Sequence, residues 1–364
     1  MIKLNEIQDD KSSENPIIRQ MSQYGHEQVV FCQDQQTGLK AIIAIHSTVL
    51  GPALGGTRMW NYSTEQDALQ DVLRLSRGMT FKASISGLDL GGGKAVIIGD
   101  AKTEKTDDLM RRFGEFVESL NGNYVTAEDV GMTPHDMKMI RQKTKNVSGI
   151  PKELGGSGDP SPVTAYGVYL GMKASAKYKW GSDCLTGKRI LVQGVGHVGM
   201  HLVKYLSKEG AVIYVTDINN ESLAVANVDY GAFVIDDSLI YDLDIDIYAP
   251  CALGATLNDF SSSRLKCAIV AGAANNQLAE ENKHAKILQD RGILYAPDFL
   301  INAGGLVSVY SELIGYDETE IFSKTEAIYD TTLNIYRKSD EDGVTTHEAA
   351  KQIAQERIDK VLSN

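Results

Sequence analysis

The sequence predicts an α/β protein of two domains, and three observations lead to this interpretation. At 364 residues the chain is too long for one ordinary hydrophobic core. Stretches rich in Val and Ile alternate with amphipathic stretches along most of its length, which indicates strands and helices in turn. Residues 149–162 (GIPKELGGSGDPSP) are rich in Gly, Ser and Pro, as is typical of chain between two packed bodies. We therefore predict one domain over residues 1–149 and a second over 150–334.

Composition narrows the classes of function. With 43% hydrophobic and 23% charged residues the chain has the values of a soluble globular protein. A net charge of −12 argues against nucleic acid as a partner, because that binding depends on clustered Lys and Arg. No apolar run approaches the ~20 residues of a membrane helix, and the first residues, MIKLNEIQDDKSSENP, are polar and acidic, unlike a signal peptide. We expect a cytoplasmic protein without a membrane partner.

Neither a disulfide framework nor a metal site is indicated. The four cysteines, Cys32, Cys184, Cys251 and Cys267, are far apart and form no CxxC pair. His197 and His201 have the spacing of two metal ligands on a helix, but no acidic third ligand is evident nearby. We expect no metal.

The elements of the first domain follow from local patterns. QVVFCQD (28–34) and LKAIIAIHSTVL (39–50) predict a β-hairpin through the turn at Gln36–Gly38. After a loop GPALGG (51–56), the stretch 63–78 predicts an amphipathic helix, opened by Ser63 and Gln66 at capping-box spacing and ended at Gly78. GKAVIIGD (93–100) predicts a buried strand, a helix follows over about 106–120, and NGNYVTAEDVG (121–131) predicts a strand that ends in an acidic loop.

Three glycines precede a lysine in GLDLGGGKAVIIG (87–99). A phosphate-binding P-loop would need Gly and Ser or Thr where this chain has Leu88 and Ala95, so that motif is excluded. Lys82 and Lys94 flank the glycines, which we expect to let a substrate approach the backbone without Cβ obstruction. A lysine among apolar strands and near a second cation would have a lowered pKa, as a base acting at neutral pH needs. Spacing alone equally allows both lysines to reach solvent from strand ends and Asp129 to cap a turn.

The second domain opens with a helix over about 163–179, and strand, glycine loop, helix and strand follow in KRILVQ, GVGHVG, MHLVKYLSKEG and AVIYVTD. Later strands fit DIDIYAP, CAIVAGA and ILYAPD, and helices fill residues 317–362. This alternation predicts a parallel, doubly wound Rossmann sheet. The C-terminal helices, about 335–364, could return to the first domain.

The glycine loop has the spacing of a dinucleotide-binding site, although a purely structural glycine turn would share it. Gly194 permits the tight turn, Gly196 lets a pyrophosphate approach, and Gly199 lets the helix pack on the strand. Amides at the start of the helix favour an anion there. Asp217, at the end of the next strand, can bind a ribose 2′-hydroxyl and would repel a 2′-phosphate, which favours NAD over NADP.

Eight motifs, spread in order over nearly the whole chain, together resemble the amino-acid dehydrogenases of the glutamate, leucine, phenylalanine and valine family. They are GPALGGTRMW (51–60), GMTFKASISGLDLGGGKAVIIGD (78–100), YVTAEDVGM (124–132), GDPSPVTAYGV (158–168), VQGVGHVG (192–199), APCALGA (249–255), GAANNQL (272–278) and INAGGL (301–306).

The resemblance implies roles for residues of both domains. Lys94 would be the base that activates water, Lys82 would hold the substrate α-carboxylate, and Asp129 would exchange a proton with the amino group. Gly55 and Gly56 would line the carboxylate end of the site. The residues implied to contact the cofactor NAD are Gly194, Val195, Gly196, His197, Val198, Gly199, Asp217, Thr164, Cys251, Ala252 and Asn275.

The implied reaction is reversible oxidative deamination of an amino acid to a 2-oxo acid and ammonia. Family members that act on glutamate place a lysine where this chain has Leu54, so we expect a branched aliphatic substrate, leucine first and valine or isoleucine next. The other implied walls are Ala127, Leu306 and Val309, for which ordinary core packing is the alternative. Leu306 stands where valine is expected, which leaves the ranking open. The family also implies a homo-oligomer, with an octamer expected. A catalytically inactive NAD-binding relative and a dehydrogenase of other specificity are the competing hypotheses.

Overall fold

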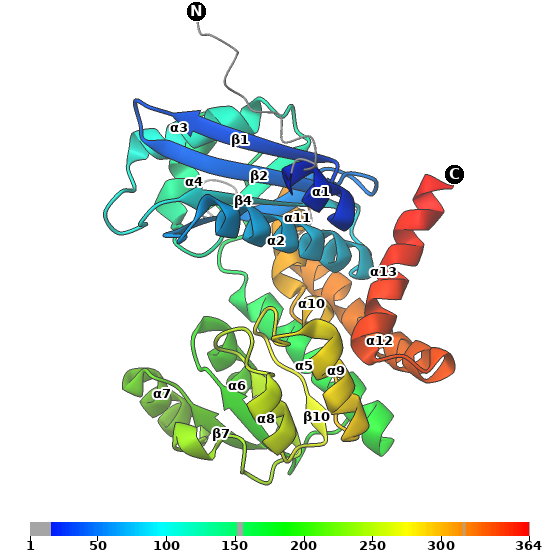
Figure 1. The fold of residues 1–364 in the computed structure, drawn as a ribbon. Helices are drawn as coiled ribbons and strands as arrows, with labels where there is room; N and C mark the ends of the chain where they lie inside the picture. The colour runs from blue at the N-terminus through cyan, green and yellow to red at the C-terminus, as the bar shows by residue number, and fades with distance from the viewer. Residues whose placement is uncertain (1–15, 151–155, 316, 364) are drawn as a thin grey trace, which may run out of the picture. The chain divides into compact units, whose positions relative to one another are not determined.

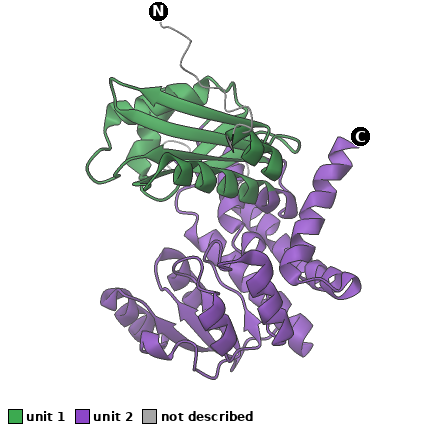
Figure 2. Cartoon of the chain, viewed as in Figure 1, with its two compact units in different colours: residues 1–80, 91–146 green, residues 81–90, 147–364 purple. Residues whose placement is uncertain are grey.

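The computed structural model describes residues 16–150, 156–315 and 317–363 and divides into two compact units. Unit 1 comprises residues 1–80 and 91–146, and unit 2 comprises residues 81–90 and 147–364, as Figure 2 shows in green and purple. The N-terminal peptide on which the cytoplasmic prediction depends and residues 151–155 of the predicted boundary segment lie outside the described residues. The domain ranges 1–149 and 150–334 remain predictions.

Unit 1 is built on a mixed five-stranded sheet in the order β1-β2-β4-β3-β5. Figure 1 labels three of these strands, β1, β2 and β4. Strand β2 pairs antiparallel with β1 and β4, whereas β3 pairs parallel with β4 and β5. Its elements are α1 (Pro16–Tyr24), β1 (Gln28–Asp34), β2 (Leu39–Ser47), β3 (Ala53–Trp60), α2 (Glu65–Ile85), β4 (Gly91–Ile98), α3 (Asp107–Glu118), β5 (Tyr124–Glu128) and α4 (Pro134–Arg141). Residues 81–85 at the end of α2 belong to unit 2.

Helix α2 covers one face of this sheet. Ile42 and Ala44 of β2 and Val96 of β4 form a buried cluster with Val72 and Leu73 of α2. Because successive side chains of a strand alternate between faces, this contact fixes which residues of β2, β3 and β4 point toward α2. That face carries the side chains discussed below.

Two predictions for unit 1 need correction, one in the type of element and one in its bounds and its cap. The stretch GPALGG is not a loop, because β3 begins at Ala53 and runs through Gly55 and Gly56. The helix predicted over 63–78 runs from Glu65 to Ile85, past Gly78, and the hydroxyl that accepts from the Asp67 amide belongs to Thr64, not to Ser63. A single glycine costs a helix only about 1 kcal/mol, which burial of the apolar face outweighs.

Unit 2 contains a six-stranded, fully parallel sheet in the order β11-β10-β9-β6-β7-β8. In chain order from β6 this is the strand order of doubly wound dinucleotide-binding folds, with a switch point between β6 and β9. The predicted Rossmann sheet is confirmed. Its elements are α5 (Ser161–Trp180), β6 (Arg189–Gln193), α6 (His197–Glu209), β7 (Val212–Thr216), α7 (Asn220–Tyr230), β8 (Phe233–Val234), a 3₁₀ turn (Asp237–Leu239), β9 (Ile247–Pro250), α8 (Asp259–Arg264), β10 (Ile269–Val270), α9 (Glu281–Asp290), β11 (Leu294–Tyr295), α10 (Asp298–Ile301), α11 (Gly304–Ile314), α12 (Glu318–Asp342) and α13 (Thr346–Leu362).

The last helix fastens the end of α2. Arg357 of α13 donates from Nη1 to the carbonyl oxygens of Ser84 (3.2 Å) and Leu88 (2.7 Å), and the Ser84 hydroxyl donates to the carbonyl of Ala354 (2.6 Å). A cation at a helix C-terminus satisfies carbonyls that lack a partner within the helix. All these residues belong to unit 2, so the assignment of residues 335–364 to the N-terminal domain remains a prediction.

Two histidines contact α2, and their lowered pKa values predict that the folded state of unit 1 loses stability in acid. His26 contacts Ser76 Oγ (2.8 Å) and His46 contacts Thr80 Oγ1 (2.8 Å), and burial lowers the pKa of each imidazole to about 4. The unfolded chain binds protons near pH 6.5 while the folded chain does not, so the stability present above that pH is lost as pH falls toward 4. We expect the free energy of unfolding to fall by up to about 1.4 kcal/mol per pH unit for each histidine.

Urea unfolding at pH 7.5, 6, 5 and 4.5 measures this slope. His46→Gln should flatten it, whereas His135→Gln, which removes an exposed histidine of the same unit, should not. Equal slopes in the wild type and in His46→Gln would contradict the role of the buried pair.

Candidate active site

Lys94 lies in the middle of β4 and pairs with the carboxylate of Asp129. The lysine is 5% exposed, and its Nζ forms an ion pair with Oδ2 of Asp129, which follows the end of β5. Lys94 lies opposite Ala44 in the ladder between β2 and β4, so its side chain is on the face covered by α2. A buried ammonium requires such a counter-charge. The alternative of a solvent-exposed lysine at a strand end does not hold for Lys94.

The three glycines before Lys94 serve packing, which corrects the expectation that they open the backbone to a substrate. They lie in β4 and are buried. A Cβ on Gly91 would lie 1.9 Å from the carbonyl oxygen of Ser47, and one on Gly92 would lie 2.1 Å from the amide of Thr80. On Gly93 it would lie 2.7 Å from the ring of Tyr124. Neighbouring strand, helix and ring therefore exclude side chains here.

Gly55 and Gly56 of β3 are explained in the same way. A Cβ on Gly55 would lie 1.7 Å from the carbonyl oxygen of Gly93, and one on Gly56 would lie 2.8 Å from the Cβ of Asp129. The absence of a side chain at Gly56 thus lets the Asp129 side chain lie against the sheet. Their predicted place at the carboxylate end of the site remains a prediction.

Leu54 and Ala127 share a face of the sheet with Lys94. Leu54 pairs with Gly92 of β4, and Ala127 pairs with Gly56 of β3. Residues paired side by side in a parallel ladder point the same way, and Gly92 and Lys94 are two positions apart on one strand. Leu54 is 2% exposed. Apolar side chains therefore lie on the face that carries the buried ion pair.

Arg58 is part of this cluster, although it was not predicted from the sequence. Its guanidinium lies between two carboxylates, with Nη1 at 3.0 Å from Asp71 Oδ2 and Nη2 at 3.5 Å from Asp129 Oδ1. A signal was present, because Arg58 is an even number of residues beyond Leu54 and Gly56 on β3 and must point to the same face. This signal could be used only if residues 53–60 were recognised as a strand, and the first of these residues were predicted as a loop.

Lys82 lies in the last turn of α2, not at a strand end, and belongs to unit 2. Its Nζ donates to Oδ1 of Asn302 (2.6 Å) and to Oδ1 of Asn275 (3.4 Å), and Asn302 Nδ2 donates to the same oxygen of Asn275 (2.8 Å). Burial lowers the pKa of Lys82 to about 8, against the opposing effect of Asp298. The ammonium therefore remains the main form at neutral pH. Asn302, like Arg58, was not predicted from the sequence.

The glycine loop of unit 2 fits a dinucleotide. Gly194 has φ +97°, a conformation that favours glycine, and a Cβ on Gly199 would lie 2.0 Å from the carbonyl oxygen of Gly194. A Cβ on Gly196 would meet nothing within 4 Å, so this residue faces open space. Helix α6 begins at His197 without a side-chain cap. Open space in front of helix amides at a sheet switch point suits a pyrophosphate.

Asp217 is fixed beside this loop. Its Oδ2 accepts from the amide of Val195 (2.7 Å) and its Oδ1 accepts from the amide of Asn219 (2.8 Å). The carboxylate thereby connects the end of β7 to the glycine loop at the end of β6. Each oxygen retains a lone pair for a ribose hydroxyl.

Of the other residues predicted to contact the cofactor, Ala252 and Cys251 lie beside the glycine loop, whereas Thr164 lies at the start of α5. Ala252 lies against Gly194, because a Cβ there would be 2.7 Å from its amide nitrogen, and Cys251 precedes it with a thiol whose pKa burial raises to about 12. Thr164, in the first turn of α5, donates its hydroxyl to the carbonyl of Pro160 (3.0 Å), the residue that precedes the helix. Leu306, which is buried, and Val309 lie on α11. Since Leu54 and Ala127 belong to unit 1, one pocket formed by all four walls remains a prediction.

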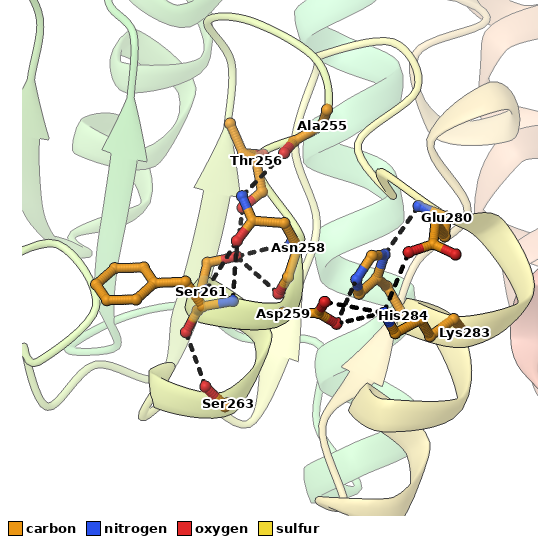
Figure 3. A network of polar contacts seen from close by, with 10 residues as sticks. Ala255, Thr256, Asn258, Asp259, Ser261, Ser263, Glu280, Lys283 and His284 are labelled. Atoms are coloured by element: carbon orange, nitrogen blue, oxygen red, sulfur yellow. Dashed lines mark hydrogen bonds and ion pairs between the residues drawn. The ribbon is translucent and has the colours of Figure 1, made fainter.

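A group of three metal-ligand side chains occurs elsewhere in unit 2. Asp259, Glu280 and His284 each offer one ligand atom, and these atoms lie within 4.8 Å of one another. Figure 3 shows the three side chains. Lys283 Nζ contacts both carboxylates, at 2.8 and 3.1 Å, and supplies the positive charge. His284 Nδ1 accepts from the amide of Glu280 (2.8 Å), and Nε2 lies 3.2 Å from Asp259. Because these polar groups already have partners, we assign no metal to them.

Comparison with known proteins identifies the family. Residues 26–146 match the family described as Glu/Leu/Phe/Val dehydrogenase, dimerisation domain, and residues 155–221 and 213–363 match Glutamate/Leucine/Phenylalanine/Valine dehydrogenase. The chain belongs to the Glu/Leu/Phe/Val dehydrogenase family. The resemblance drawn from its motifs is therefore confirmed. It is an NAD(P)-dependent amino-acid dehydrogenase, an oxidoreductase acting on a CH–NH₂ group.

Relatives within the family differ in their named substrates. The chain is 53% identical to a leucine dehydrogenase of Thermoactinomyces intermedius, over 93% of this chain and 92% of that protein. It is 48% identical to an L-tryptophan dehydrogenase of Nostoc punctiforme, over 92% and 94% of the two chains. A crystal structure of L-tryptophan dehydrogenase from Nostoc punctiforme matches with a TM-score of 0.85 and 46% identity, covering 95% of this chain and 100% of that one. Among the described residues, no helix is both long enough and apolar enough to cross a membrane.

Proposed function

We propose that the protein catalyses the reversible, NAD-dependent oxidative deamination of branched-chain L-amino acids, with leucine preferred over valine and isoleucine, to 2-oxo acids and ammonia. The observation that carries the proposal is the buried Lys94–Asp129 pair on the same sheet face as Leu54. The high identity to a leucine dehydrogenase supports the choice of substrate.

The side chains have distinct roles in this reaction. Lys82 binds the substrate α-carboxylate, since an ammonium already held by two amide oxygens presents its remaining proton in a fixed direction. Bound NAD⁺ supplies the acceptor for the hydride that leaves Cα. Neutral Lys94 takes a proton from the water that adds to the resulting iminium carbon. Asp129, in contact with Lys94, exchanges a proton with the amino group as ammonia leaves.

Leu54 determines the class of side chain that the site accepts. A glutamate side chain would place its carboxylate against a leucine that is 2% exposed, without a cation, and such burial is strongly unfavourable. An aliphatic side chain gains from the same contact, at roughly 0.8 kcal/mol per buried methylene.

A panel of initial rates tests the proposal. Leucine, valine, isoleucine, phenylalanine, tryptophan and glutamate are each supplied with NAD⁺ and with NADP⁺, and formation of the reduced nicotinamide is followed. We expect leucine with NAD⁺ to give the highest kcat/KM. The 48% identity to a tryptophan dehydrogenase makes an aromatic substrate the second candidate, and a higher kcat/KM for tryptophan would select it. Binding of NADH without turnover of any amino acid would select the inactive relative.

Asp217→Ala should change cofactor preference. Loss of the carboxylate removes the partner of the ribose 2′-hydroxyl and the repulsion of a 2′-phosphate, so NADH should bind about 10-fold more weakly while NADPH does not weaken. Fluorescence titration with both dinucleotides measures the two dissociation constants.

The matched control is Asp217→Asn, which keeps an oxygen that can accept from the Val195 amide. An equal loss of NADH and NADPH affinity in Asp217→Ala, restored for both in Asp217→Asn, would show that the residue only supports the loop.

We propose further that the protein is a cytoplasmic homo-oligomer, with an octamer expected. The match of residues 26–146 to a dimerisation domain supports assembly through unit 1. Light scattering coupled to gel filtration gives the subunit number, and a monomer at micromolar concentration would contradict the proposal.

A further inference from the structure

The carboxylate of Asp129 is held by three donors on two oxygens. Oδ2 pairs with Lys94, whereas Oδ1 accepts from the amide of Val130 (2.5 Å) and lies 3.5 Å from Nη2 of Arg58. The plane of the carboxylate is therefore fixed. Arg58 is the cation of this set that has no role in the proposed reaction.

Arg58 is in turn anchored on Asp71 of α2. Its Nη1 lies 3.0 Å from Asp71 Oδ2, a closer contact than the one with Asp129. Asp71 is held in place by the hydroxyl of Tyr62 (2.8 Å) and by Arg74 Nη2 (3.1 Å). The side chains of Arg58, Asp71 and Asp129 are 23%, 17% and 18% exposed, so water screens their charges only in part.

We propose that Arg58 is a positioning residue of the reaction, which holds Asp129 ionised and correctly oriented beside Lys94. This inference rests on the proposed function, because it gives Asp129 and Lys94 their roles. Two charge-assisted contacts from one planar guanidinium fix direction as well as charge, which a lysine could not do. Arg58 acts through Asp129 and is not itself a catalytic residue.

The sign of its electrostatic effect follows from the neighbouring charges. A cation near Lys94 favours loss of the lysine proton, and an anion opposes it. Removal of the Arg58 charge should therefore make Lys94 hold its proton to higher pH. Removal of the Asp71 charge should do the opposite, because Asp71 then no longer offsets the guanidinium.

The other titratable and charged groups that face the cluster are unchanged in these variants, so they do not account for the predicted changes in the pH at which Lys94 loses its proton. From β2, His46 has a pKa of about 4 and is neutral throughout the measured range. From α2, Arg74 contacts Asp71 and Arg77 interacts with the histidine pair. Burial raises the pKa of Glu128, at the end of β5, and its charged neighbours are Asp136 and Lys105.

The test compares the pH dependence of kcat/KM for leucine deamination in the wild type, Arg58→Gln and Asp71→Asn. We expect the acid limb of the Arg58→Gln profile to move to higher pH by about half a unit or more, and that of Asp71→Asn to move to lower pH. The Arg58→Gln change should also lower kcat about 10-fold or more while KM for NAD⁺ stays within twofold. Arg112→Gln is the control, since it removes an arginine of the same unit that pairs with Asp34 and Glu115 instead.

General damage to the fold would lower activity without moving the two limbs in opposite directions. Unmoved limbs in both variants would overturn the role of Arg58, even when activity falls. If Arg58→Gln does not fold, Asp71→Asn decides, and an unmoved limb there overturns the proposal. A wild type that turns over no amino acid overturns the proposed function itself and with it the reaction that Arg58 would serve.

Discussion

Replacement of Lys94 by alanine is expected to lower kcat/KM for leucine deamination by about 10²–10⁴-fold, the usual contribution of a general base. Alanine removes the group that takes the proton from water. NADH should bind with an affinity within twofold of the wild type, because the glycine loop and Asp217 belong to unit 2 and Lys94 to unit 1. Steady-state kinetics and NADH fluorescence titration measure the two effects.

Lys138→Ala provides the control for this change, because it removes an exposed lysine of α4 in the same unit. The Lys94→Ala variant should still fold, since Asp129 retains Arg58 and the Val130 amide as partners. A comparable loss of NADH affinity and of turnover would contradict the assigned role of Lys94, as would a fully active variant.

Leu54→Lys is expected to lower kcat/KM for leucine by at least about 100-fold. The substitution places an ammonium at a position that is 2% exposed, and an unpaired charge there is disfavoured by several kcal/mol. A glutamate side chain offers that ammonium a carboxylate, so kcat/KM for glutamate should rise. The ratio of the two values in one preparation is the measurement, and it is independent of the folded fraction.

Leu54→Met is the matched control, because it keeps apolar character and similar volume, and its effect on leucine should stay within about 10-fold. If Leu54→Lys folds and turns over leucine as the wild type does, Leu54 does not line the substrate site. The absence of any gain on glutamate, with leucine activity lost, would limit the role of Leu54 to excluding charge.

The sequence predicted elements well where a regular pattern met a clear boundary. β1 begins and ends where QVVFCQD does, and Thr106 caps α3 as a polar residue before an amphipathic stretch should. β3 escaped prediction because Gly55 and Gly56 have low strand propensity. Glycine is needed at both positions because β4 and Asp129 occupy the space that a side chain would fill. These neighbours are distant in the chain, so the sequence around Gly55 and Gly56 does not reveal them.

The candidate site shows the same division. The glycine loop and Asp217 were predictable because a β-α-β unit places them together through local chain geometry. Lys94 and Asp129 were named through family resemblance, and their contact appears only when β4 and β5 lie in one sheet. Arg58 lies on β3, the strand that was not predicted, so its place on the same sheet face as Lys94 was not recognised. Asp71 and Asn302 had no local signal that separated them from surface residues.

By itself the sequence determined the class of fold, the dinucleotide loop and the family. Each of these depends on residues that are close together in the chain, or on motifs that follow one another in a fixed order. The tertiary structure alone decided which charges meet, since Lys94, Asp129, Arg58 and Asp71 come from three strands or their ends and one helix. It also showed that the glycines before Lys94 allow close packing of neighbouring elements against β4. Burial sets the strength of a charge interaction, and burial depends on the packing of the whole unit.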